Sequence, residues 1–300
     1  MPRQKYRSTI WLNLFGLLRL FLVKPYPQAT VRIFVNGQSA ETKTDAAGYF
    51  RVEVPTEKPL DAGWHTVRAE LSLKERVVIH GEGRVLVPHP TPFACISDID
   101  DTFLISHSAT LTKRLKVLLT KNAHTRKPFE GVVAHYQLLA QATHDPSTLN
   151  PFFYVSSSEW NLYDYILEFS KKNDLPEGVY LLSPLKQLNE VLKTGQGKHM
   201  TKFMRAVRIL ETYPNQPFVL LGDDTQEDPT IYASLVEHFP RQIRCVYIRQ
   251  VHGKNQPKTR DILKRIEAVG VPCCYFAHSA DARQHSIEIG LTASGHQSTN

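Results

Sequence analysis

The sequence predicts an α/β protein in which a three-layer parallel sheet, covered by helices, follows a small all-β sandwich domain. Three observations support this prediction. Residues 27–90 contain short alternating strands without a helical period, which is typical of an all-β module. From residue 93 onward, short apolar runs alternate with helical patterns, as they do when helices cover both faces of a parallel sheet. Pro88, Pro90 and Pro92 lie between the two regions and predict a stiff connector.

The composition excludes several classes of protein. The chain has 300 residues, of which 42% are hydrophobic and 22% charged, so it can bury a core and is not a disordered chain. Its four cysteines cannot form a disulfide framework, and we interpret them as reduced thiols of a cytoplasmic protein. The lack of charge-free apolar runs of about 18–20 residues argues against a polytopic membrane protein. The net charge of +7 favours an anionic partner, such as a phosphorylated solute, an acidic membrane or nucleic acid.

Residues 1–26 form a basic and apolar segment that we expect to be a helix. Its first 24 residues contain five basic side chains and no acidic one, and the stretch 10–23 is mostly Leu, Phe and Trp. A cleaved signal peptide is the least favoured interpretation, because Asn13 and Arg19 interrupt the apolar stretch and no small-residue cleavage site follows. A helix packed on the protein's own core and an interfacial helix at an anionic membrane both remain open.

In the all-β region, the residue pattern predicts several short strands. The stretch 30–37 predicts a strand that runs into a turn, and 44–54 predicts a turn that runs into an alternating strand. Further strands are expected over residues 63–71, 76–79 and 83–87. The Thr-Asp-x-x-Gly-Tyr-Phe run in the second of these stretches resembles a turn of transthyretin-like modules, which favours a transthyretin- or Ig-like sandwich.

The second domain, residues 93–292, is expected to alternate parallel strands with helices. The predicted strands cover residues 93–97, 151–155, 179–182, 218–221, 243–248 and 274–276. The predicted helices cover residues 108–120, 129–142, 159–172, 198–212, 228–238, 257–268 and 279–289. Residues 293–300 are expected to be a flexible tail.

Acidic and hydroxyl side chains follow three of these strands. Asp98 and Asp100 follow the first strand, Ser156 follows the second, and Asp223 and Asp228 follow the fourth. Ligands of a parallel sheet bind beyond the carboxyl ends of its strands. Converging carboxylates repel one another and need a cation, and an all-oxygen site suits Mg²⁺. Two clusters at corresponding strand ends disfavour the alternative, in which each is only a polar turn with Asp as a helix cap.

These clusters resemble the motifs of the haloacid-dehalogenase (HAD) superfamily of phosphatases. The matching runs are Asp98-x-Asp100-x-Thr102, Ser156 after its apolar strand, and Gly222-Asp223-x-x-x-x-Asp228. More narrowly, the runs at 97–102, 154–162 and 220–229 resemble the actin-patch-protein type of phosphatidate phosphatase family. The resemblance covers roughly residues 93–292 and implies an HAD-like Rossmannoid fold for this domain.

The resemblance also implies chemical roles. Asp98 would be the nucleophile that forms an aspartyl-phosphate, and Asp100 would be the general acid and base. Thr102 and Ser156 would hydrogen-bond the phosphoryl oxygens.

The metal site and the third motif follow from the same resemblance. The side chains of Asp98 and Asp223 and the backbone carbonyl of Asp100 would hold Mg²⁺. Asp228 would either bind the ion itself or contact one of the groups that bind it. The third motif is a lysine, and its spacing from a later proline favours Lys202 over the alternative, Lys198. That lysine would neutralise transition-state charge and keep the nucleophile ionised.

The sequence thus predicts a Mg²⁺-dependent phosphatase that acts on phosphatidate or a related lipid phosphate and yields diacylglycerol. Too few residues separate the motifs for a large cap, which suits a membrane-held substrate. The stretch 113–127 is basic and free of acids, and two interpretations stay open: a solvated helix face, or a basic wall beside the site that faces anionic lipid. A phosphatase for a soluble or protein-linked phosphomonoester is the alternative, and a non-enzymatic membrane-associated module is a third.

The expected location is cytoplasmic, with peripheral contact to an anionic membrane. Nucleic acid is not an expected partner, because no motif interleaves aromatic and basic residues as single-strand binders do. The oligomeric state stays open.

Overall fold

The computed structural model describes residues 25–73, 77–100, 102, 128–143, 145, 147–184 and 196–292. The chain divides into two compact units, one over Leu22–His89 and the other containing Pro90–Asn300. Four sequence predictions lie outside the described residues: the N-terminal helix before residue 25, the helix over 108–120, the basic stretch 113–127 and the tail after residue 292.

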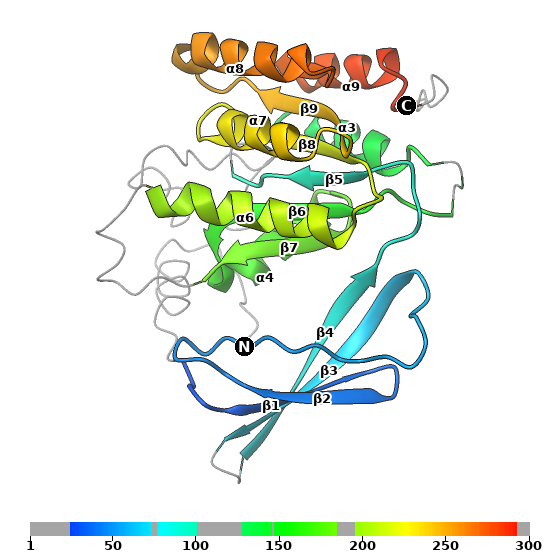
Figure 1. Ribbon diagram of the computed structural model, residues 1–300, viewed down its shortest axis with the longest axis vertical. Helices are drawn as coiled ribbons and strands as arrows, with labels where there is room; N and C mark the ends of the chain where they lie inside the picture. The colour runs from blue at the N-terminus through cyan, green and yellow to red at the C-terminus, as the bar shows by residue number, and fades with distance from the viewer. Residues whose placement is uncertain are drawn as a thin grey trace. The chain divides into compact units, whose positions relative to one another are not determined.

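The first unit is a four-stranded antiparallel sheet (Figure 1). Its strands, in the order β2-β1-β3-β4, are β1 (Thr30–Val35), β2 (Gln38–Lys43), β3 (Gly63–Leu73) and β4 (Val77–Val87). Val31, Ile33 and Val35 of β1 are buried at every second position, as expected for a strand with one covered face.

The all-β character of this unit agrees with the sequence prediction, but the described residues form one sheet instead of the two sheets of a sandwich. The strand predicted within 44–54 is absent, and β2 pairs with β1 instead. Asn36 and Gly37 have positive φ angles of 46° and 79°, which suits a tight hairpin that returns the chain at once. The sequence of β2, Gln38–Lys43, is almost entirely polar, so its hydrophobic pattern gives no strand signal.

The second unit contains a six-stranded parallel sheet in the order β10-β9-β8-β5-β6-β7. The strands are β5 (Ala94–Ser97), β6 (Phe152–Glu159), β7 (Gly178–Ser183), β8 (Phe218–Asp223), β9 (Ile243–Arg249) and β10 (Cys273–Phe276). The parallel α/β architecture predicted for this region is confirmed. Strand β6 extends four residues beyond its predicted end, with an irregularity in its pairing between Val155 and Glu159.

Helices cover both faces of this sheet and make it the middle of three layers (Figure 1). The helices are α3 (Val132–Ala140), α4 (Tyr163–Lys172), α6 (Gln196–Thr212), α7 (Asp228–His238), α8 (Gln256–Ala268) and α9 (Ser279–Glu288), with short 3₁₀ turns at Trp160–Leu162 and Gly253–Asn255. One core cluster contains side chains of α3, α4 and α9, and the other contains side chains of α6, α7 and α8.

The strand order determines where the motif residues meet. β5 lies between β8 and β6, so the carboxyl ends of these three strands are neighbours although they are far apart in sequence. Helix α6 leads from β7 to β8 and therefore begins at the same edge. All four cysteines are free thiols. Within the described residues, no helix is both long and apolar enough to span a bilayer.

Candidate active site

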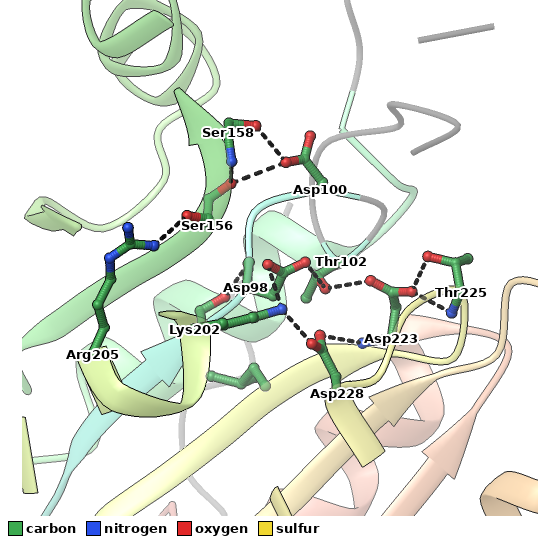
Figure 2. A network of polar contacts seen from close by, with 12 residues as sticks. Asp98, Asp100, Thr102, Ser156, Ser158, Lys202, Arg205, Asp223, Thr225 and Asp228 are labelled. Carbon is green, nitrogen blue, oxygen red and sulfur yellow. Dashed lines mark hydrogen bonds and ion pairs between the residues drawn. The ribbon is translucent and has the colours of Figure 1, made fainter. Parts of the chain in front are cut away.

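The residues singled out in the sequence gather at the carboxyl edge of the parallel sheet (Figure 2). Asp98 directly follows β5, Asp223 is the last residue of β8, and Asp228 is the first residue of α7. Asp98, Asp223 and Asp228 are all buried, and each offers a carboxylate oxygen within 4.8 Å of those of the other two. This is a candidate site for a cation with oxygen ligands.

Lys202 of α6 supplies the positive charge within this group. Its Nζ lies 2.7 Å from Oδ1 of Asp98 and also forms an ion pair with Oδ1 of Asp228. Figure 2 shows the lysine between these two carboxylates. The side chain of Lys198, the alternative motif lysine, lies outside the described residues.

The electrostatics of the cluster are unbalanced. Burial raises the pKa of Asp98 well above its usual range, and the Lys202 ammonium only partly opposes this. Burial, and then the charge of Asp228, raises the pKa of Asp223 to about 7. Burial alone would lower the pKa of Lys202, but the two carboxylates beside it raise it above its ordinary value. Burial is thus the main cause of both raised carboxyl pKa values, and a cation held between these carboxylates would oppose the rise.

Thr102 and Thr225 orient the carboxylates. The Thr102 hydroxyl lies 3.2 Å from Oδ2 of Asp98 and 3.1 Å from Oδ2 of Asp223, so it bridges two segments separated by 121 positions. Both the backbone N–H and the hydroxyl of Thr225 donate to Oδ1 of Asp223. The backbone N–H of Asp223 in turn donates to Oδ2 of Asp228 at 3.3 Å.

Gly222 makes room for this arrangement. A Cβ atom at this position would lie 2.6 Å from Oδ2 and 2.9 Å from Cβ of Asp228. Any side chain there would therefore displace the Asp228 carboxylate from the cluster.

Asp100 has a different environment from the other three carboxylates. Its Oδ2 accepts hydrogen bonds from the hydroxyls of Ser156 at 3.0 Å and Ser158 at 2.6 Å, both on β6. Ser156, which is predicted to hydrogen-bond a phosphoryl oxygen, therefore contacts Asp100, the predicted acid–base residue, in this structure. Arg205 of α6 donates to the Ser156 carbonyl at 3.0 Å and so fixes the end of β6.

The motifs gave Thr225 and Arg205 no role, whereas Ser158 was a less certain candidate for a loop hydroxyl and Asp224 a less certain candidate for a helix cap or a residue behind the metal ligands. Asp224 lies next to the cluster, but its carboxylate accepts hydrogen bonds from the backbone N–H groups of Val251 and His252 and from the Tyr275 hydroxyl. It holds the loop after β9. The sequence signal for Ser158 is the Ser-Ser-Ser run at 156–158, because alternate residues of a β-strand, here Ser156 and Ser158, lie on one face.

The fold and the site together define a class: an α/β protein whose parallel sheet carries a buried carboxylate cluster with one lysine at its carboxyl edge. A sequence model of the family described as "Phosphatidate phosphatase APP1, catalytic domain" matches residues 93–250. The chain belongs to this family, since the match covers more than half of it and includes every residue of the candidate site.

Two curated relatives match this chain. Phosphatidate phosphatase APP1 of Saccharomyces cerevisiae is 28% identical over 162 residues, which are 53% of this chain and 26% of the yeast protein. An uncharacterized protein of Schizosaccharomyces pombe is 25% identical over 240 residues, which are 74% of this chain and 37% of that protein. The chain therefore spans well under half the length of either relative.

Among solved structures, a carbohydrate acetylesterase from Xanthomonas citri matches with 11% identity and a TM-score of 0.29, covering 83% of this chain and 62% of its own. A likeness this low carries no argument about fold or function.

Proposed function

We propose that this protein is a Mg²⁺-dependent phosphatase with an HAD-like catalytic unit, which hydrolyses phosphatidate or a related lipid phosphate through an aspartyl-phosphate. The observation that carries the proposal is the separation of two carboxylates, Asp98 and Asp100, into environments that suit different chemistry. Family membership supports the substrate class, because the yeast relative is named a phosphatidate phosphatase.

Asp98 is suited to be the nucleophile. The ion pair with Lys202 favours its ionised form, and the Thr102 hydroxyl fixes the orientation of the carboxylate. In the first step, a carboxylate oxygen of Asp98 forms a bond to phosphorus while the bond from phosphorus to the ester oxygen breaks. Lys202 stabilises the negative charge that develops on the transferring group.

Asp100 is suited to move the proton. In its acid form it gives a proton to the departing ester oxygen, which leaves as the hydroxyl of diacylglycerol. In the second step, the Asp100 carboxylate takes a proton from the water that attacks the aspartyl-phosphate. Phosphate then leaves and Asp98 is regenerated. The two serine hydroxyls donate to Oδ2 of Asp100, which orients this carboxyl group and favours its ionised form, the form that acts as the base in the second step.

The donor set fits Mg²⁺. Asp98, Asp223 and Asp228 would hold the ion through carboxylate oxygens, the ligands this cation prefers. These three carboxylates and the Lys202 ammonium in contact with them have a formal charge of −2, equal in size to the charge of one divalent cation. When bound, Mg²⁺ would neutralise this charge and that of the phosphoryl group. The backbone carbonyl of Asp100 stays a predicted further ligand.

A phosphate-release assay tests the proposal. The full chain is given phosphatidate in mixed micelles, or soluble phosphomonoesters such as an aryl phosphate, a phosphopeptide and a sugar phosphate. Each is tested with Mg²⁺ and with EDTA. We expect Mg²⁺-dependent release that is fastest from phosphatidate. Full activity in EDTA would remove the metal assignment, and a clear preference for a soluble substrate would replace phosphatidate.

We also propose that the N-terminal segment brings the protein to anionic lipid at the cytoplasmic face of a membrane. Its first 24 residues carry five basic side chains and no acid. Each basic residue near an anionic bilayer contributes about 1 kcal/mol, screened by salt, and apolar side chains add a term that salt does not change. Deletion of residues 1–24 should weaken binding to phosphatidate-containing vesicles and leave aryl phosphate hydrolysis unchanged. A deletion variant that folds and binds vesicles as tightly as the full chain would contradict this.

A further inference from the structure

Arg249 is a buried cation beside the candidate site that none of the recognised motifs contains. It is the last residue of β9 and is only 3% exposed. In the pairing of β8 with β9, its register partner is Asp223, one of the three clustered carboxylates. A buried arginine is costly unless its donors are used, so its contacts indicate what it does.

The contacts of Arg249 join three parts of the catalytic unit. Its Nε donates to the backbone carbonyl of Thr102 at 3.0 Å, and its Nη2 donates to the Ser279 hydroxyl at 2.8 Å. The hydroxyl of Ser279, the first residue of α9, in turn donates a hydrogen bond to the Glu130 carbonyl at 2.8 Å. Arg249 thus connects the loop after β5 with the start of α9 and the segment before α3.

Two aromatic rings contact the flat guanidinium. Its central carbon lies 4.6 Å from the ring centroid of Phe129 and 4.9 Å from that of Phe276. None of the carboxylates in the described ranges forms an ion pair with Arg249, so its hydrogen bonds go to neutral oxygens. Its charge is therefore left to act on the acidic cluster, and Asp223 is among the groups that interact with it electrostatically.

We propose that Arg249 is a positioning residue for the phosphatase site: by holding the Thr102 carbonyl, it keeps the Thr102 hydroxyl between Asp98 and Asp223. That hydroxyl is the direct link between the proposed nucleophile and the carboxylate at the end of β8. Arg249 acts through Thr102 on the metal ligands, which is why its effect should appear in metal affinity as well as in turnover. The proposal rests on the function proposed above.

The geometry requires arginine and not only a positive charge. A lysine ammonium at this position could retain the charge, but not the two separate donors or the flat faces that contact Phe129 and Phe276. Arg249→Lys and Arg249→Met therefore separate the contribution of the planar fork from that of the charge. Arg244→Met is the matched control, because Arg244 is an exposed arginine of the same strand.

The test measures metal binding and turnover separately on the full chain. Mn²⁺, a paramagnetic substitute for Mg²⁺, is titrated without substrate and followed by electron paramagnetic resonance. Loss of a residue that orients metal ligands typically weakens metal binding or activity about 10- to 100-fold. We expect a weakening in this range for Arg249→Met, a smaller one for Arg249→Lys, and none for Arg244→Met. We also expect kcat for aryl phosphate to fall while KM stays within about twofold, because no substrate contact is removed.

A double-mutant cycle with Thr102→Val tests the route of the effect. If Arg249 acts through the Thr102 hydroxyl, Arg249→Lys adds little to the loss of Mn²⁺ affinity that Thr102→Val already causes. Additive losses would overturn the proposal, and so would wild-type Mn²⁺ affinity and kcat in a folded Arg249→Lys protein. A drop in thermal stability with unchanged Mn²⁺ affinity and kcat would assign Arg249 a structural role only.

Ser279→Ala is a milder variant that keeps the test decisive if Arg249→Met does not fold. It removes one partner of the guanidinium and should weaken Mn²⁺ binding in the same direction. Unchanged Mn²⁺ affinity in Ser279→Ala and in Arg249→Lys would contradict the proposal. Because Mn²⁺ titration needs no turnover, a wild-type protein that binds Mn²⁺ but releases no phosphate would refute the proposed function while the cycle still tests Arg249.

Discussion

The two halves of the site use the same side chain in contrasting surroundings. Asp98 lies in a cluster of opposite and like charges, with Lys202, Asp223 and Asp228 around it. Asp100, two residues further along the chain, is held by two neutral serine hydroxyls. The Lys202 ammonium opposes the rise that burial causes in the pKa of Asp98, whereas the contacts to Asp100 come from hydroxyl groups that orient it for proton transfer. The difference teaches that environment, and not residue type, would divide the work between nucleophile and acid–base residue.

The largest expected effect on turnover comes from the half of the site that contains Asp98 and Lys202. Asp98→Asn should abolish phosphate release, because an amide is nearly isosteric with the carboxylate but cannot attack phosphorus. The variant should fold, since Thr102 and Lys202 still have an oxygen to contact. Phosphate release and far-UV circular dichroism measure the two expectations. Asp164→Asn, at an exposed position of α4, is the control. Retention of a tenth of wild-type turnover by Asp98→Asn would exclude Asp98 as the nucleophile.

Asp100→Asn should have the next largest effect, and of a different kind. General acid–base assistance is worth about 10² to 10⁴ in rate, so turnover should fall by that factor. Because hydrolysis of the intermediate also loses its base, protein labelled from ³²P-phosphatidate should retain phosphate that hydroxylamine releases. Wild-type turnover in this variant would mean that the two halves of the site do not divide the work as proposed.

The same contrast explains what the sequence could and could not predict. The clustered carboxylates follow apolar strands, and strand ends of a parallel sheet must meet, so Asp98 and Asp223 could be placed together from sequence. Arg249 also ends an apolar strand, but one arginine carries no motif, and its partner is a backbone carbonyl that no side-chain pattern records. The all-β unit was predicted less well than the catalytic unit, because the polar strand β2 is recognised only through its pairing with β1.

Ser158→Ala should have a smaller effect, confined to the half of the site that contains Asp100 and its two serines. It removes the shorter of the two hydroxyl contacts to Asp100 and leaves that of Ser156. A net hydrogen bond to a charged group is worth about 1.5–3 kcal/mol, so kcat should fall by roughly 10- to 100-fold at most. Its pH profile should shift while Mn²⁺ affinity stays unchanged. Ser234→Ala, on α7, is the control. Weaker Mn²⁺ binding in Ser158→Ala would show that the two halves are not independent.

The smallest expected effect is on stability and lies outside both halves of the site, at His135 of α3. It tests whether a loss of activity at acid pH comes from the site or from unfolding of the protein. Burial lowers the pKa of His135 to about 3, with the charges of Arg249, Arg283 and His285 acting in the same direction. Its Nε2 lies 3.0 Å from the Ser286 hydroxyl. The folded protein therefore keeps His135 neutral, whereas the unfolded chain takes up a proton there near the ordinary pKa of about 6.5.

Protonation of the unfolded chain sets the sign of the pH dependence. Below about pH 6.5 the unfolded state binds more protons at His135 than the folded state does, so this residue makes stability fall as the pH falls, by at most about 1.4 kcal/mol per pH unit. Urea unfolding of Asp98→Asn between pH 7 and 5, with and without His135→Gln, measures this slope in a protein without turnover. Asp223, whose pKa is raised to about 7, contributes a slope of the opposite sign, so His135→Gln should make stability fall less, or rise more, as the pH falls. His252→Gln, which replaces an exposed histidine, should leave the slope unchanged. An unchanged slope in His135→Gln would mean that acid loss of activity is to be sought in the carboxylates of the site instead.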